Sequence, residues 1–289
     1  MRITIVGSGY IGMALARHWR QQPAINLTLT TTSPSRLAAL EPLADQVRVL
    51  RADDPAALHG GLAHADAAVF CLAPTGDRQV DADGYRATYR DGMATLQRLL
   101  PELPQLRQIV YTGSCSVYGD AGGAWVDERT PAAPADEHGR ILLESEGLLA
   151  RCRSEGRRVC VLRLGAIHGP ERELTDRFAR LAGSTRPGSG AQHCSWIHRD
   201  DVVGAVAAAV REGWNEVVNL VDDQPWTVAG LLDAVCRARG LAPVQWDTAQ
   251  MPEPSPADRR ISNRRLHELG YRLQHPRLKF RSEGSADGF

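Results

Sequence analysis

Short apolar runs alternate with longer segments of mixed polarity along most of this chain. The runs are rich in β-branched residues, which is typical of strands buried on both faces, and the segments between them have the length and composition of helices. The strands predicted in this way are 2–6, 26–30, 47–50, 67–72, 108–111 and 216–221. Strands and helices in regular alternation predict an α/β fold with a doubly wound parallel sheet.

The helical segments between and after these strands are less regular. Residues 81–100 predict one long helix, and shorter helices are expected at 173–181, 199–211 and 228–239. Residues 182–192 are rich in glycine and proline, so we expect a loop there.

A glycine-rich turn follows the first predicted strand directly and precedes a helix-forming segment. The turn has the sequence Gly7-Ser8-Gly9-Tyr10-Ile11-Gly12. Gly7 permits the tight turn, Gly9 lets the backbone approach a pyrophosphate, and Gly12 lets the helix pack against the strand. The first amides of the helix supply N–H donors and partial positive charge. In this context the pattern predicts a Rossmann dinucleotide-binding fold, with all six residues at the cofactor.

The end of the second strand bears on the choice between the two coenzymes. NAD-binding proteins usually place an acidic residue here, whereas NADP-binding proteins place hydroxyls and an arginine for the 2′-phosphate. No acidic residue occurs between Gly12 and Glu41, and Thr31, Ser33 and Arg36 are suitable phosphate partners. We therefore predict NADP as the cofactor in preference to NAD.

Two further segments are expected near this cofactor. Asp53 follows the third strand and either lies near the adenine or caps the helix that begins at Pro55. The loop after the fourth strand carries Leu72, Ala73 and Pro74 to the edge of the sheet where α/β proteins bind ligands.

Composition excludes several classes of function. Formal net charge is zero, so nothing draws the whole chain to nucleic acid or to an anionic membrane. There is neither a secretion signal nor an apolar run of membrane-spanning length, so we expect a cytoplasmic protein. The six cysteines are scattered without metal-ligand spacing, and no metal is predicted. The sole lysine is Lys279, near the C-terminus.

Several segments together resemble the extended short-chain dehydrogenases, the NAD-dependent epimerase/dehydratase family, and more weakly its YeeZ-type bacterial branch. The segments that carry the resemblance are 89–96, 111–120, which closes with Val-Tyr-Gly, 162–170, 196–202, 219–225 and 260–270. The resemblance implies a dinucleotide domain of residues 1–170, to which 195–221 return, and a small C-terminal substrate lobe of 171–194 and 222–280. Residues 281–289 have the composition of a flexible tail. Members of the family often form homodimers.

The candidate catalytic residues depart from the family's pattern. Ser114 matches the family's Ser/Thr that binds the reacting oxygen, although a hydroxyl at a strand end can also satisfy local backbone. Tyr118 is either part of the turn or faces the substrate. The family's Tyr and Lys, four residues apart on the next helix, are here His138 and Leu142. An imidazole can exchange a proton near neutral pH without help from a lysine, yet His138 can also be an exposed residue of the first helical turn with no part in the chemistry.

The family pattern also places His168 and His198 at the substrate.

Two functions are compatible with these sequence features. The first is an NADP-dependent oxidoreductase or epimerase-like enzyme that acts on a small carbonyl or hydroxyl compound through an atypical active site. The second is a non-catalytic NADP(H) sensor that has lost the Tyr/Lys pair.

Overall fold

The computed structural model describes residues 1–74, 81–250, 252–253 and 255–280. The predicted tail, 281–289, lies outside the described residues. The chain divides into two compact units. Unit 1 comprises Met1–Val117, Pro134–Arg163 and Val202–Val218, and unit 2 comprises Tyr118–Ala133, Leu164–Asp201 and Asn219–Phe289.

A seven-stranded sheet, ordered β12-β7-β5-β4-β1-β2-β3, forms the centre of the described fold and confirms the predicted doubly wound α/β class. β1 pairs in parallel with β2 and β4, β2 with β3, and β4 with β5. The strands are β1 (Arg2–Val6), β2 (Asn26–Thr31), β3 (Gln46–Val49), β4 (Ala67–Phe70), β5 (Gln108–Ser114), β7 (Arg158–Leu164) and β12 (Val217–Leu220).

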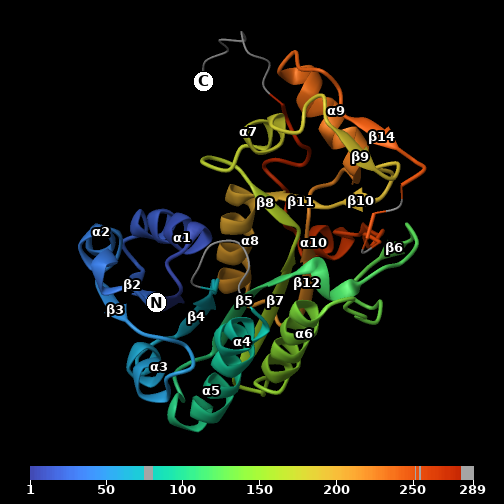
Figure 1. The fold of residues 1–289 in the computed structure, drawn as a ribbon. Helices are drawn as coiled ribbons and strands as arrows, with labels where there is room; N and C mark the ends of the chain where they lie inside the picture. Colours follow the sequence, from blue (N-terminus) through green and yellow to red (C-terminus); the bar gives the residue numbers. More distant parts are fainter. Residues whose placement is uncertain (75–80, 251, 254, 281–289) are drawn as a thin grey trace. The chain divides into compact units, whose positions relative to one another are not determined.

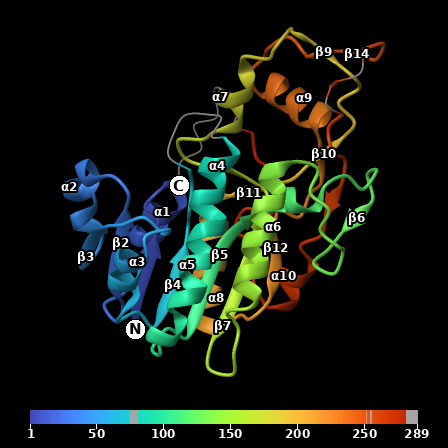
Figure 2. The ribbon, with the colours of Figure 1, turned by 60° about the horizontal axis from the view of Figure 1, so that its bottom comes forward.

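Helices cover both faces of this sheet. In Figures 1 and 2, α5 and α6 lie side by side in front of the strands and α8 lies behind them. The helices are α1 (Tyr10–Arg20), α2 (Leu37–Leu40), α3 (Pro55–Leu62), α4 (Ala82–Tyr85), α5 (Gly92–Leu99), α6 (Glu137–Ala150) and α8 (Arg199–Glu212). Strand residues such as Ile5, Leu29 and Val69 are fully buried between these layers, as their apolar pattern predicts.

The helix predicted at 81–100 is present without a break from Ala82 to Leu99, but its middle is a π-helical turn that the sequence did not indicate. Asp81 caps α4 by accepting from the Gly84 amide, and a π-helical turn, η3 (Arg86–Asp91), then separates α4 from α5. A π turn inserts an extra residue and so changes which side chains share a helix face. Turns of this kind are frequent at functional sites.

Unit 2 is built from short strands and three helices within the described residues. These elements are β6 (Trp125–Val126), β8 (Ala166–His168), α7 (Leu174–Ala179), β9 (Thr185–Pro187), β10 (His193–Cys194), β11 (Trp196–His198), β13 (Trp226–Thr227), α9 (Val228–Ala238), β14 (Gln245–Asp247), β15 (Arg260–Ile261) and α10 (Arg264–Glu268). The segment predicted as a loop, 182–192, contains β9, which pairs in parallel with β14. A partner strand distant in sequence therefore overrides local turn chemistry.

Four segments group with a different unit from the one expected. Residues 118–133, 164–170, 195–201 and 219–221 were expected in the dinucleotide domain, but they group with unit 2. For 118–133 the reason is strand pairing, since β6 pairs in parallel with β15 and the Ala121 amide donates to the Asp258 carbonyl. The pairing partners follow more than a hundred residues later, so the local sequence pattern does not indicate this pairing.

Candidate functional site

The glycine turn after β1 has the geometry that close packing requires. Gly7 has φ +105°, and a Cβ there would collide with the Cys71 carbonyl. A Cβ at Gly12 would collide with the Gly7 carbonyl, so α1 can start close to β1 only with glycine at this position. Gly9 differs, because an added Cβ would meet no atom of the described residues within 4 Å. The fold itself therefore leaves open space beside Gly9, at the N-terminus of α1.

A pocket lies at this turn, within unit 1. Its walls come from the turn and from the ends of β2, β3 and β4: Val6, Gly7, Ser8, Gly9, Thr30, Thr31, Thr32, Arg36, Leu50, Arg51, Ala52, Asp53, Cys71, Leu72, Ala73, Pro74, Ala87 and Thr88. Among the residues expected at the cofactor, Tyr10, Ile11, Gly12 and Ser33 are absent from this lining. Tyr10 and Ile11 begin α1, where their amides belong to the helix N-terminus.

Two hydroxyls at the end of β2 hold the turn and the strand end in place. The Thr30 hydroxyl accepts a 3.0 Å hydrogen bond from the Gly7 amide, a positioning role that sequence analysis missed. The Thr31 hydroxyl accepts from the Ser33 amide at 3.2 Å. Ser33 therefore supports the strand end, whereas Thr31 lines the pocket.

Two arginines line the pocket where β2 and β3 end. Arg36 donates to the Ser8 hydroxyl at 3.2 Å and to the Ser8 carbonyl at 2.8 Å, so its guanidinium lies at the glycine turn. Arg51 is the second, and it was not singled out from the sequence. Arg51 binds Asp53 through two hydrogen bonds, of 3.0 and 2.9 Å. Asp54, not Asp53, caps α3 by accepting from the Ala57 amide.

Ser114 lies at the end of β5, half-buried, and its hydroxyl oxygen accepts from the Ser116 amide at 3.1 Å. Because that bond uses an oxygen lone pair, the hydroxyl proton remains available to donate. Tyr118, in unit 2, is only 3% exposed, and its hydroxyl donates to Asn219 Oδ1 at 2.8 Å. The structure thus favours the first of the two roles considered for Tyr118, a structural part of the turn.

His138 lies in the first turn of α6, which is capped by Asp136. Gly139 brings this turn close to the chain after β5, since an added Cβ would lie 2.7 Å from Pro134 and 3.4 Å from the Ser116 carbonyl. The His138 ring contacts the ring of Tyr85, with centroids 4.2 Å apart. Tyr85 is the last residue of α4, and sequence analysis did not identify it as a neighbour of His138. Burial, followed by the charge of Asp136, raises the pKa of Tyr85.

The rest of this face of α6 is packed into the core. Leu142, at the position of the family's lysine, is 5% exposed. One turn later, Glu146 forms an ion pair with Arg163 of β7, in which Arg163 Nε and Nη2 approach the carboxylate at 3.1 and 2.6 Å. Burial raises the pKa of Glu146, and the arginine opposes that shift. Position 142 is thus occupied by a buried leucine, which carries no charge.

His168 and His198, expected at the substrate, belong to unit 2 and lie close together. They are register partners on β8 and β11, and their ring centroids are 5.1 Å apart. Burial, with the neighbouring His198 and His275, lowers the pKa of His168 to about 4. Burial likewise lowers the pKa of His198. Both imidazoles are therefore neutral at physiological pH.

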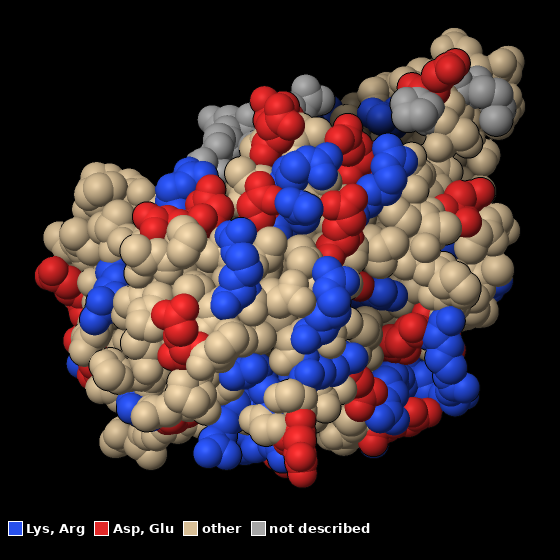
Figure 3. All heavy atoms as spheres, turned by 90° about the horizontal axis from the view of Figure 1, so that it is seen from below, with Lys and Arg blue, Asp and Glu red and all other residues tan. Residues whose placement is uncertain are grey.

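The surface and the helices bear on the partners excluded above. On the face that Figure 3 presents, basic and acidic side chains are interspersed, so this face offers no continuous basic surface for a nucleic-acid backbone. Among the described residues, every helix is too short or too polar to cross a bilayer.

Comparisons with known proteins agree with this geometry. A sequence profile described as the NAD dependent epimerase/dehydratase family matches residues 3–220. Protein YeeZ of Escherichia coli is 29% identical over 95% of this chain and 96% of its own. D-erythronate dehydrogenase of Cupriavidus necator is 31% identical, covering 82% and 81% respectively.

Solved structures agree at the level of the fold. A UDP-glucose 4-epimerase from Thermotoga maritima superposes with a TM-score of 0.79 at 18% identity, over 95% of this chain and 94% of the other. A conserved protein of unknown function from Silicibacter pomeroyi superposes with a TM-score of 0.74 at 23% identity, over 96% and 94%.

Proposed function

Since the chain belongs to the NAD-dependent epimerase/dehydratase family, we propose that it is an NADP-dependent oxidoreductase of atypical active site. Its substrate would be a small hydroxyl or carbonyl compound. A short hydroxy acid is the first class to test, because one relative is named for dehydrogenation of D-erythronate.

The observation that carries this proposal is the pocket at the glycine turn, with Arg36 and Arg51 in its wall. The free space beside Gly9 and the N-terminus of α1 suit a pyrophosphate. Two guanidinium groups suit an additional phosphate on the adenosine ribose, because arginine binds phosphate through paired hydrogen bonds. Asp53 is the only carboxylate among the described residues of the lining. It is already bound to Arg51, and the pair presents little net negative charge to a phosphate.

In the oxidising direction, a bound NADP⁺ would supply the hydride acceptor for the substrate's C–H bond, and the substrate's O–H proton would pass to a base of this chain. We assign the base to the His138 imidazole, with the Tyr85 ring packed against it, and we assign the hydrogen bond to the reacting oxygen to the Ser114 hydroxyl. The Leu142 position leaves no lysine to activate a tyrosine here, so an imidazole is the appropriate acid–base group.

Titration calorimetry with NADPH and with NADH tests the cofactor assignment. NADPH should bind more tightly than NADH. Arg36→Ala should weaken NADPH binding about 10- to 150-fold, since a hydrogen bond to a charged group contributes ~1.5–3 kcal/mol. NADH binding should change little. Arg48→Ala is the matched control, because Arg48 lies outside the pocket lining and hydrogen-bonds Gln46. Equal losses for both coenzymes would contradict the 2′-phosphate assignment.

Turnover of short hydroxy acids with NADP⁺ tests the chemistry separately. His138→Ala should lower kcat about 10²- to 10⁴-fold, the usual contribution of general acid–base catalysis, without changing the Kd for NADPH. Undiminished kcat in this variant would remove His138 from the mechanism.

A second candidate function, a non-catalytic NADP(H) sensor, rests on the buried Leu142 in place of the lysine. It predicts NADPH binding with no turnover of any hydroxy acid or carbonyl compound, and a partner protein whose association depends on the coenzyme.

A further inference from the structure

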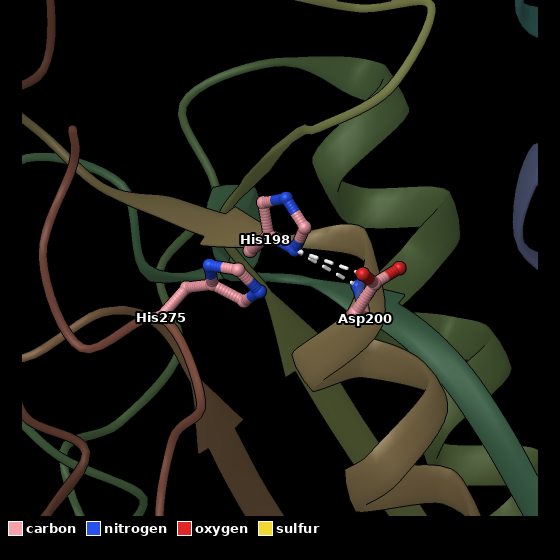
Figure 4. A group of neighbouring side chains, drawn as sticks. All are labelled: His198, Asp200 and His275. Carbon is pink, nitrogen blue, oxygen red and sulfur yellow. Dashed lines mark hydrogen bonds and ion pairs between the residues drawn. The ribbon is translucent and has the colours of Figure 1, made fainter. Parts of the chain in front are cut away.

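We propose that His198, Asp200 and His275 of unit 2 form a binding site for one divalent transition-metal ion of the zinc class. The three side chains come from the end of β11, the first turn of α8 and the chain after α10 (Figure 4). The proposal is independent of the cofactor and of the proposed reaction.

The ligand atoms are already close to coordinating distance. One nitrogen or oxygen from each side chain lies within 4.8 Å of the other two. A point equidistant from three atoms at that separation is at most about 2.8 Å from each, whereas zinc lies roughly 2.0–2.2 Å from nitrogen and oxygen ligands. Each ligand atom therefore needs to shift by less than about 1 Å to reach that distance, although the His275 ring must also turn to aim its lone pair at the ion.

The hydrogen bonding of His198 leaves two hydrogen-bond acceptors facing each other, Nδ1 of the ring and Oδ2 of Asp200. His198 Nδ1 accepts from the Asp200 amide at 3.2 Å, so in the neutral ring the proton is on Nε2. The lone pair of Nδ1 then lies 3.8 Å from Asp200 Oδ2, with no proton between the two atoms. Figure 4 shows the His198 ring edge and the carboxylate turned toward one another. A cation between them would take the Nδ1 lone pair in place of the Asp200 amide and would convert this repulsive arrangement into coordination.

The backbone holds the third ligand in place. The His275 and Gln274 amides donate to the two carboxylate oxygens of Asp201, at 2.9 and 2.6 Å, and Asp201 is completely buried. His275 is thus tied to the residue that follows Asp200. Its ring stacks on that of His198, with centroids 3.7 Å apart and planes inclined by 29°. Coordination requires the His275 ring to turn about its own side-chain bonds, and the anchored backbone stays where it is.

The donor set selects the class of metal. Two imidazoles and one carboxylate suit Zn²⁺ and its neighbours in the first transition row, whereas Mg²⁺ and Ca²⁺ prefer oxygen ligands alone. The His198 side chain is 12% exposed and that of Asp200 is 44% exposed, so the site is shielded on one side and reachable by an ion on the other. Three protein ligands leave a fourth tetrahedral position for water or for an oxygen ligand.

The experiment uses the untagged full-length protein after treatment with a chelator. Co²⁺ is titrated and followed by its visible ligand-field bands, and Zn²⁺ is then added to displace it. We expect one saturable equivalent, and a rise of several degrees in the melting temperature on adding Zn²⁺, because the ion binds only the folded state. Absence of saturable binding to the wild-type protein would overturn the proposal.

Substitutions locate the ion. His198→Ala, His275→Gln and Asp200→Asn should each weaken Co²⁺ binding ~100-fold or more, since even loss of a residue that only orients a metal ligand costs 10- to 100-fold. His267→Gln is the matched control, because His267 also pairs with a carboxylate, Asp223 at 2.7 Å, but does not belong to this three-residue cluster. Circular dichroism of each metal-free variant checks that it folds. Unchanged affinity in the folded His275 and Asp200 variants, or an equal loss in the control, would refute the assignment.

Discussion

Alanine replacements of Gly9 and Gly12 distinguish a glycine that cofactor binding needs, Gly9, from one that the fold needs, Gly12. Gly9 has φ −72° and ψ −159°, which alanine adopts readily, and the added Cβ meets no atom of the described residues within 4 Å. Loss of glycine at a helix N-cap costs roughly 0.5–1 kcal/mol. Alanine also restricts the unfolded chain, which raises the free energy of unfolding by about 0.4–1 kcal/mol. The free energy of unfolding should therefore change by less than about 0.5 kcal/mol, because these two contributions nearly cancel.

The effect on the cofactor should be large. A backbone amide contacts a phosphate oxygen at about 2.9 Å. A carbon beside it cannot approach that oxygen closer than roughly 3.3 Å. The methyl group of Gly9→Ala would push the pyrophosphate away from the start of α1. Loss of one charge-assisted hydrogen bond of ~1.5–3 kcal/mol weakens binding about 10- to 150-fold, and a second lost bond multiplies the effect.

Titration calorimetry with NADPH measures the binding, and the thermal midpoint measures the fold. Gly12→Ala is the contrasting variant: its Cβ would overlap the Gly7 carbonyl, so it should lower the thermal midpoint strongly. Wild-type affinity for NADPH in Gly9→Ala would refute the placement of the pyrophosphate. A thermal midpoint as low as that of Gly12→Ala would refute the claim that the fold leaves this space open.

Three further predictions concern buried polar groups. Glu146→Gln should cost about 3–5 kcal/mol, because it removes the carboxylate that pairs with the buried Arg163 charge, and replacing both residues by methionine should restore most of that loss. Denaturant midpoints measure both effects, and a cost below 1 kcal/mol for the single variant would contradict the reasoning. Tyr111→Phe should stabilise by about 1 kcal/mol, because among the described residues its buried hydroxyl has no hydrogen-bond partner; a loss of stability would argue against it. Burial, followed by the charge of Asp223, raises the pKa of Asp222 to about 8 from its ordinary value of 3.8, so the fold favours its neutral form. The resulting stability is fully present below pH 3.8 and is lost as the pH rises toward 8, whereas Asp222→Asn should not show this component; parallel pH profiles for the two proteins would exclude it.

The sequence by itself determined the fold class and the position of the glycine turn. Both depend on neighbouring residues: β1, the glycine turn and α1 follow one another without a break, and the close contacts at Gly7 and Gly12 arise within one strand–turn–helix unit and the strand beside it. The apolar strands were recognised because burial on both faces imposes a continuous apolar run. The family resemblance was confirmed for the same reason, since its motifs are contiguous.

Only the tertiary structure decided which distant side chains meet. Arg51 reaches the pocket from the end of β3. Tyr85 contacts His138 from the last position of α4, just before a π turn that the apolar pattern does not indicate. His275 joins His198 because Asp201, buried at the start of α8, binds two backbone amides of the C-terminal segment. Such contacts depend on the register between strands and on hydrogen bonds between segments far apart in the chain. Local periodicity reports the burial of each segment but not its partner.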